Sequence, residues 1–228
     1  MKEIIKPGFF NNNTADANDA RREHYDVLNE QLVNMGKEPD VLFIGDSITI
    51  NWELRLYLDD LGYMVNRGIG GDNTHYINRR AEADVFQLNP KRVVYMAGTN
   101  DLMATLPDMW WQKPGRPAEE VVAQSLANIE DFAKRCGNTK LFLCSVIPSS
   151  LYETFDKDAY NRAILMLNEG IKALCEKYNA TYVDYHSALC QADGMTVQDG
   201  LTHEGIHPNH KGYSIMSEVL RKAIAERG

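Results

Sequence analysis

A chain of 228 residues, 44% of them hydrophobic, can bury one substantial core, and we expect a single domain. Its formal net charge of -8 comes from acidic residues spread along the chain, without a basic cluster that could neutralise a row of phosphates, which argues against nucleic acid as a partner. No run approaches the roughly 18 apolar residues of a membrane span, and residues 1–13 have no apolar core long enough for a secretory signal. We therefore expect a soluble cytoplasmic protein, or a secreted or periplasmic one if a signal was removed, since the asparagines at 11–13 suit the start of a mature secreted chain.

Short apolar runs of strand character alternate with longer segments of helical period, which predicts a parallel sheet with helices on both faces. A first helix is expected over Ala17–Met35, because its apolar residues recur at helical spacing and would pack against the core. The expected strands are Val41–Gly45, Met64–Arg67, Arg92–Ala97, Lys140–Ile147 and Thr181–Tyr185. The further expected helices are Asn51–Leu61, Thr74–Phe86, Ala118–Arg135, Lys157–Tyr178 and Asn209–Ala225. Five such strands fit a three-layer α/β/α sandwich around a flavodoxin-like parallel sheet.

Two connections are longer than a minimal loop, and the four cysteines carry no pairing pattern. The connections, Leu102–Pro117 and Pro148–Asp156, both follow the carboxyl ends of strands, which is the edge where open parallel sheets bind ligands. The cysteines are widely spaced without a C-x-x-C pair, so we expect small buried side chains rather than a disulfide framework or a metal site.

The first expected strand breaks into Gly45-Asp46-Ser47-Ile48-Thr49. A serine in the turn between a buried strand and a helix holds its hydroxyl at the helix N-terminus, close to backbone N–H groups. This position suits a nucleophile. Taken alone, the pattern equally allows Ser47 or Thr49 simply to cap the helix that follows.

The next two expected strands bring possible hydrogen-bond donors to the same edge. The second is followed by a glycine-rich turn containing Gly70 and Gly71, and the third ends in Gly98-Thr99-Asn100-Asp101. The N–H groups of Ser47 and Gly71 and the amide of Asn100 would give a developing oxyanion three donors, each worth about 3 kcal/mol. Ordinary turn chemistry explains each of these residues singly.

Among six histidines, His207 stands out because it lies in a loop-like stretch, Thr202–Tyr213, that leads into the last helix. Glu204, three residues earlier, could hold the imidazole in the tautomer that accepts a serine proton. His24 and His186 suit surface or core positions, and His75 and His210 are assigned no role.

One rival interpretation is a zinc hydrolase, because His203-Glu204-Gly-Ile-His207 matches H-E-x-x-H. That motif works only on a helix, where both histidines share one face. Gly205 interrupts it and Pro208 biases His207 away from the α region, so the stretch is expected to be a loop without zinc.

In chain order, the segments Gly45-Asp46-Ser47-Ile48, Gly71, Gly98-Thr99-Asn100-Asp101 and Glu204-Gly-Ile-His207-Pro resemble the four sequence blocks of the SGNH, or GDSL, hydrolase family. The resemblance covers residues 39–228, and residues 1–38 would form an N-terminal extension whose helix packs on this hydrolase domain. It implies a flavodoxin-like fold and hydrolysis of esters or thioesters without a metal or an organic cofactor.

By position in the family, Ser47 would be the nucleophile and first oxyanion donor, Gly71 the second donor, Asn100 the third, and His207 the base. The family usually has aspartate three residues before this histidine, where the sequence has Glu204. Glutamate orients a histidine in other hydrolases, so Glu204 is preferred as the acid and Asp199 is a second candidate.

The expected reaction passes through an acyl-enzyme on Ser47, with a carbohydrate or lipid ester as the substrate. Asp46 and Asn73 are expected to contact substrate, together with Trp110 and Trp111 in the long connection. These tryptophans could stack on a sugar ring, which would favour deacetylation of carbohydrate, bind an acyl chain, or pin the loop to the core. The non-enzymatic alternative is a module that binds a phosphate or a sugar at the Gly70-Gly71 turn. Nothing in the sequence marks an oligomer interface.

Overall fold

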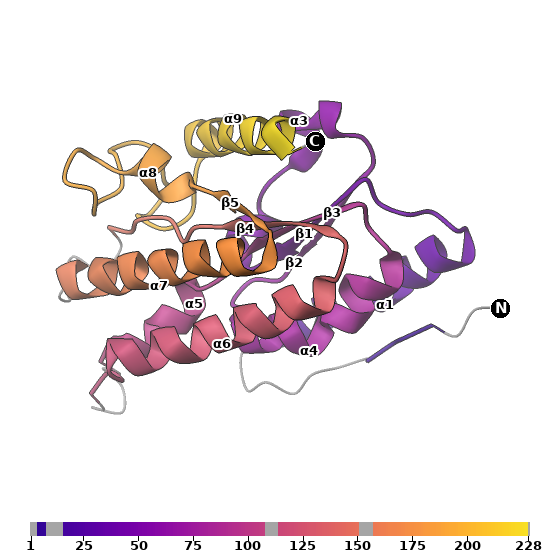
Figure 1. The fold of residues 1–228 in the computed structure, drawn as a ribbon, viewed down its shortest axis with the longest axis horizontal. Helices are drawn as coiled ribbons and strands as arrows, with labels where there is room; N and C mark the ends of the chain where they lie inside the picture. The colour runs from indigo at the N-terminus through magenta and orange to yellow at the C-terminus, as the bar shows by residue number, and fades with distance from the viewer. Residues whose placement is uncertain (1–3, 8–15, 108–113, 151–156, 228) are drawn as a thin grey trace.

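The computed structural model, which describes residues 4–7, 16–107, 114–150 and 157–227, has a central parallel sheet with helices on both faces (Figure 1). The strand order is β2-β1-β3-β4-β5, and every neighbouring pair is parallel. The strands are β1 (Val41–Gly45), β2 (Met64–Gly68), β3 (Arg92–Met96), β4 (Lys140–Cys144) and β5 (Thr181–Val183). The predicted three-layer sandwich with a flavodoxin-like sheet is confirmed.

The longer helices form the two outer layers. One face of the sheet is covered by α1 (Asp16–Asn34), α4 (Thr74–Asp84), α6 (Ala118–Cys136) and α7 (Lys157–Tyr178). The other carries α3 (Leu54–Tyr57), α8 (Tyr185–Leu189) and α9 (His210–Arg227). Short helices α2 (Ser47–Ile50) and α5 (Thr99–Leu102) follow β1 and β3, and single 3-10 turns span Asp59–Leu61 (η1), Phe86–Leu88 (η2) and Met103–Thr105 (η3). Within the described residues, no helix combines the length and apolarity needed to cross a membrane.

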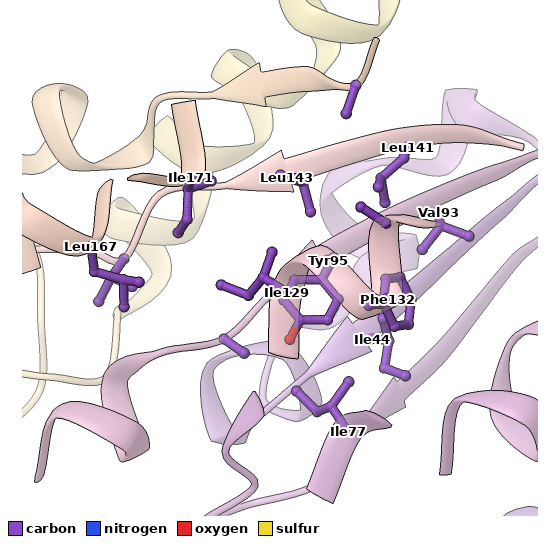
Figure 2. Close-up of a cluster of buried hydrophobic side chains, with 14 of the residues drawn as sticks. Ile44, Ile77, Val93, Tyr95, Ile129, Phe132, Leu141, Leu143, Leu167 and Ile171 are labelled. Atoms are coloured by element: carbon purple, nitrogen blue, oxygen red, sulfur yellow. The ribbon is translucent and has the colours of Figure 1, made fainter. Parts of the chain in front are cut away.

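Each face of the sheet has its own hydrophobic core. Figure 2 shows the core under α4, α6 and α7, where strand residues such as Ile44 and Tyr95 meet the helix residues Ile77, Ile129 and Phe132. All five are at most 1% exposed, and burying each such side chain stabilises the fold by roughly 1.5–3 kcal/mol. The four cysteines are free and buried, as predicted.

The second core is organised around Trp52. Its ring lies edge-on to Phe43 and Tyr185, with centroids 5.9 and 6.1 Å away, and stacks on Tyr213 at 5.4 Å. Since Phe43 belongs to β1 and Tyr213 to α9, this aromatic cluster packs the last helix against the first strand.

The predicted helix over Asn51–Leu61 is wrong, because the chain there forms only α3 and η1 after α2 has ended. Asn66 of β2 is the physical reason, since its amide nitrogen donates to the carbonyls of Thr49 at 2.8 Å and Trp52 at 3.4 Å. These bonds take carbonyl groups that a continuous helix would need. They also leave Trp52, 3% exposed, turned into the core.

Strand β3 ends one residue before the predicted Ala97, and strands β4 and β5 end further short of the predicted Ile147 and Tyr185. After Cys144, the backbone N–H and C=O of Val146 pair with the side-chain amide of Asn168, at 2.7 and 2.9 Å, which replaces the strand ladder. At β5, the strand ends at Val183 because Asp184 caps the short helix α8, accepting from Ser187 N at 3.0 Å.

Helix α1 is attached to the sheet layer through buried polar groups. Arg22, 1% exposed, forms ion pairs with Asp26 on its own helix and with Asp84 of α4. Tyr25 donates its hydroxyl to the carbonyl of Gly68 at the end of β2, at 2.6 Å. Helix α1 therefore contacts both α4 and the strand end that leads into the Gly70-Gly71 turn.

Arg80 of α4 lies at the centre of this polar layer and is 1% exposed. Its guanidinium donates to the carbonyls of Gly45 at 3.0 Å and Arg67 at 2.7 Å, and to the carboxylates of Asp72 at 2.6 Å and Asp84 at 3.1 Å. Burial alone would lower the pKa of Arg80, but the two carboxylates more than offset it and raise that pKa. One side chain thus joins the ends of β1 and β2 to the turn that follows β2.

Replacing Arg80 by methionine is expected to reduce the free energy of unfolding by about 3–5 kcal/mol, because Asp72 and Asp84 lose a buried charge partner. The measurement is urea unfolding followed by circular dichroism. Arg79→Met, at the exposed neighbouring position on α4, is the matched control and should change stability by no more than about 1 kcal/mol. Equal stability of the two variants would contradict the role given to Arg80.

Candidate active site

The candidate site lies at the carboxyl edge of the sheet, where the ends of β1, β2 and β3 meet. Gly45, the last residue of β1, is in register with Gly68 of β2 and Met96 of β3. The segments that follow these three strands carry Ser47, Gly71 and Asn100 respectively. The parallel topology therefore brings together residues that are far apart in the sequence.

The turn after β1 is built by Gly45 and Asp46. A Cβ on Gly45 would lie 2.2 Å from Thr49 Oγ1 and 2.3 Å from Met96 O, so no side chain fits. Asp46 is the N-cap of α2, with its carboxylate accepting from Ile48 N at 2.9 Å. Because Asp46 performs the capping, the alternative in which Ser47 or Thr49 caps this helix is wrong, and the Ser47 hydroxyl is left for other contacts.

Ser47, His207 and Glu204 form a continuous chain of contacts. The hydroxyl of Ser47 lies 2.8 Å from His207 Nε2, and His207 Nδ1 contacts Glu204 Oε1. If Nδ1 carries the proton and donates it to the carboxylate, Nε2 is left to accept the serine hydroxyl proton. The His207 and Glu204 side chains are 34% and 42% exposed, so this chain of contacts is open to solvent. Within the described residues Glu204, not Asp199, contacts His207.

The loop carrying His207 is closed by its own hydrogen bonds. His203 N donates to His207 O at 2.9 Å, and Asn209 caps α9 by accepting from Lys211 N at 2.9 Å. The Tyr213 hydroxyl donates to Ile48 O at 2.8 Å, which ties α9 to the helix that carries Ser47. Sequence reasoning missed Tyr213 as a support of the site, since an aromatic residue on a helix is typically read as core.

The H-E-x-x-H stretch is not helical. Residues 201–208 form bends and an isolated bridge, and Gly205 has a φ of +95°. His207 already contacts Ser47 through one ring nitrogen and Glu204 through the other. The geometry that a zinc-protease motif requires is therefore absent from this described loop.

Asn100 and Gly71, the other expected oxyanion donors, are joined through Asp72. Asn100 Nδ2 donates to Asp72 O at 2.9 Å, while its contact with Asp46 Oδ2, at 3.5 Å, is at the limit of hydrogen bonding. One of its two amide N–H groups is thus only weakly engaged. Gly71 is exposed and has a φ of +82°, a conformation that favours glycine in this turn.

The predicted substrate-contacting residues differ in their placement. Asp46 is 1% exposed, which gives it a positioning role behind the serine rather than a surface for substrate. Asn73 is partly exposed and caps α4, accepting from Tyr76 N at 3.1 Å. Trp110 and Trp111 lie outside the described residues.

Asp101 next to Asn100 is a support that sequence reasoning did not assign. Its carboxylate accepts from Thr74 N at 3.0 Å, Thr74 Oγ1 at 2.5 Å and Ser125 Oγ at 3.1 Å. It therefore ties α5, which carries Asn100, to α4 and α6. Burial raises the pKa of Asp101, although these hydrogen bonds favour the charged form.

Comparison with known proteins agrees with this geometry. Residues 43–215 match the GDSL-like Lipase/Acylhydrolase family. Platelet-activating factor acetylhydrolase IB subunit alpha1 of Bos taurus is 25% identical over 193 residues, which cover 82% of this chain and 76% of the relative. An acetylxylan esterase of Xylanibacter ruminicola is 29% identical over 175 residues, which cover 71% of this chain but only 33% of that esterase.

Solved structures give the same result at the level of the fold. A GDSL-like lipase from Bacteroides thetaiotaomicron superposes with a TM-score of 0.74 at 26% identity, covering 90% of this chain and 98% of that one. An acetylxylan esterase from Geobacillus stearothermophilus, at 20% identity and a TM-score of 0.63, covers 81% of this chain and 93% of its own, and shares the fold. The protein is thus an α/β protein whose parallel sheet carries a serine–histidine–glutamate group at its carboxyl edge. The chain belongs to the GDSL-like lipase/acylhydrolase family.

Asp46 gives the site a measurable dependence on pH. Burial raises its pKa from the ordinary value of 3.8 to about 7, which the hydrogen bond from Ile48 N opposes and the nearby Asp72 carboxylate reinforces. Because the folded pKa lies above the unfolded one, the folded state binds more protons in this range. The contribution of Asp46 to stability is therefore largest below pH 4 and is lost as the pH rises towards 7.

In the variant Asp46→Asn, the side chain keeps an oxygen that can cap α2, but the amide does not ionise. We expect wild-type stability, relative to this variant, to fall between about pH 4 and pH 7 and to level off above that range. Urea unfolding of both proteins at pH 5, 6, 7 and 8 gives the difference directly. A difference that stays constant with pH would mean that the Asp46 pKa is not raised in the folded protein.

Proposed function

We propose that the protein is a serine esterase that hydrolyses carboxylic esters through an acyl-enzyme on Ser47. The observation that carries the proposal is the 2.8 Å contact between Ser47 Oγ and His207 Nε2, with Glu204 on the opposite ring nitrogen. A serine hydroxyl is a weak nucleophile at neutral pH, and a histidine oriented by a carboxylate is the arrangement that activates it. Membership of a family of lipases and acylhydrolases supports the same reaction.

In the proposed reaction, the Ser47 oxygen attacks the ester carbonyl carbon while His207 takes the hydroxyl proton. The N–H groups of Ser47 and Gly71 and the Asn100 amide stabilise the charge on the carbonyl oxygen. The bond to the alcohol oxygen then breaks, and His207 returns the proton to the leaving alcohol. In the second half, His207 takes a proton from a water molecule whose oxygen attacks the acyl carbon. The bond to Ser47 Oγ then breaks, and His207 returns the proton to that oxygen, so the acid is released and both residues end in their starting states.

We further propose that the acyl group is small, with acetyl as the first candidate. The two curated relatives described above are named for an acetylhydrolase and an acetylxylan esterase, which have different alcohols but share the acetyl group. The shared acetyl group therefore supports an acetyl assignment for the acyl part of the substrate and leaves the alcohol part open.

A non-catalytic module binding a phosphate or sugar at the Gly70-Gly71 turn is the second candidate. Binding at that turn does not require the contacts among Ser47, His207 and Glu204, so this candidate does not explain them. A side chain as exposed as Glu204 is held on His207 only at a cost in conformational entropy, and catalysis gives a reason for that cost.

The first experiment compares wild type with Ser47→Ala on p-nitrophenyl acetate, in parallel assays without and with EDTA. The variant should lose at least about three orders of magnitude in kcat, because nothing else in the described site can form the acyl-enzyme. Equal rates for the two proteins would show that Ser47 is not the nucleophile. If neither protein turns over the ester, the binding-module candidate gains. Loss of wild-type activity on adding EDTA would favour the zinc interpretation.

The role of Glu204 is tested by Glu204→Gln beside Asp199→Asn. The glutamine cannot hold a developing imidazolium by charge, so kcat on the same ester should fall by about two to four orders of magnitude. Asp199→Asn should retain wild-type kcat. The reverse ranking of the two variants would transfer the acid role to Asp199.

A further inference from the structure

A polar groove leads away from the candidate site along the α4–α6 face. It is bordered by the N-terminal ends of α4 and α6 and by α5, and its volume is about 280 Å³. The residues that matter for its chemistry are Asn73, Asn100, Asp101, Arg116, Gln124 and Asn128. The volume lies close to the lower end of the roughly 300–1,000 Å³ range of small-ligand sites.

The groove begins at a residue of the candidate active site. Asn100, the proposed third oxyanion donor, is part of its lining, and so is Asn73, which follows the Gly71-Asp72 turn. An ester held with its carbonyl oxygen against Asn100 therefore has this groove beside it. One of its two substituents, the acyl group or the alcohol, can extend there.

The lining favours the alcohol over an acyl chain because it offers hydrogen-bonding groups. Asn73 uses its oxygen for the α4 cap, and its amide nitrogen has no partner among the described residues. The Gln124 side chain is exposed, and among the described residues it contacts only Asn128, at 3.5 Å. The apolar surface of the lining comes from Ala104, the buried Val121 and the rings of His75 and Tyr76. These few groups stand among polar side chains and offer too little continuous apolar surface to bind a long acyl chain.

The charges along the groove offset one another. Arg116 lies 4.0 Å from Glu120, and both side chains are more than half exposed. The Asp101 carboxylate is satisfied by Thr74 and Ser125 within the groove wall. An anionic ligand would face Asp101 as well as Arg116, so the balance favours an uncharged ligand.

We infer that this groove binds the alcohol part of the ester, and that this alcohol is an uncharged, hydroxyl-rich sugar. The inference rests on the proposed esterase function and names the class of alcohol that the function leaves open. Arg116 and Gln124 supply hydrogen bonds to hydroxyl groups, while Asn73 and Asn100 connect the groove to the reacting carbonyl.

The test compares two esters of the same acid, monoacetylated methyl xyloside and p-nitrophenyl acetate. Gln124→Leu and Arg116→Met should each lower the ratio of kcat/KM for the sugar ester to that for the aryl ester by about five-fold, mainly through KM. Gln31→Leu, an exposed glutamine on α1 away from the groove, is the matched control and should leave the ratio unchanged. All three positions are exposed, so misfolding is not expected to obscure the result.

Binding without turnover separates this inference from the proposed function. Methyl xyloside should bind Ser47→Ala protein in isothermal titration, and Gln124→Leu in that background should weaken it. Absence of binding at millimolar concentration, or ratios in the two groove variants that match Gln31→Leu, would overturn the inference even if the protein is an esterase. Preference for acetyl glycerophosphate over the sugar ester, lost in Arg116→Met, would overturn it in favour of an anionic alcohol.

Discussion

The geometry of the site depends most on the buried hydrogen bonds and ion pairs that the Arg80 guanidinium forms. A buried positive charge is costly unless it is paired and its N–H groups are satisfied, and Arg80 meets both conditions through two carboxylates and two carbonyls. Its partners include Gly45, two residues before Ser47, and Asp72, directly after Gly71. Movement of either segment would break a buried hydrogen bond, so the same charge fixes the turn that carries Ser47 and the turn that carries Gly71 relative to each other.

This arrangement gives the N-terminal helix a part in the site. Arg22 of α1 shares the Asp84 carboxyl group with Arg80, and Tyr25 bonds to the carbonyl at the end of β2. On the opposite face, the bond from Tyr213 to Ile48 O holds α9 against the helix that begins at Ser47. Hydrogen bonds from α4 on one face and α9 on the other therefore hold the turn that carries Ser47. The side chains of Glu204 and His207, in contrast, are partly exposed to solvent.

The sequence predicted the fold and the position of the main site residues because both follow from strong regularities. The carboxyl ends of parallel strands lie at one edge of the sheet, so the sequence alone predicted that Ser47, Gly71 and Asn100 lie at the same edge. The polar layer could not be foreseen, since Arg22 and Arg80 lie on helices, where charged residues usually face solvent. The helix expected over Asn51–Leu61 failed for a similar reason, because the hydrogen bonds that break it come from Asn66, on another strand.

Covalent labelling gives the most direct test of whether Ser47 is a nucleophile activated by His207. Wild type and His207→Ala would be treated with a fluorophosphonate and digested, and the modified residue identified by mass spectrometry. We expect stoichiometric modification of Ser47 in wild type and loss of that modification in His207→Ala. Modification at another residue, or none in wild type under conditions that label a known serine hydrolase, would contradict it.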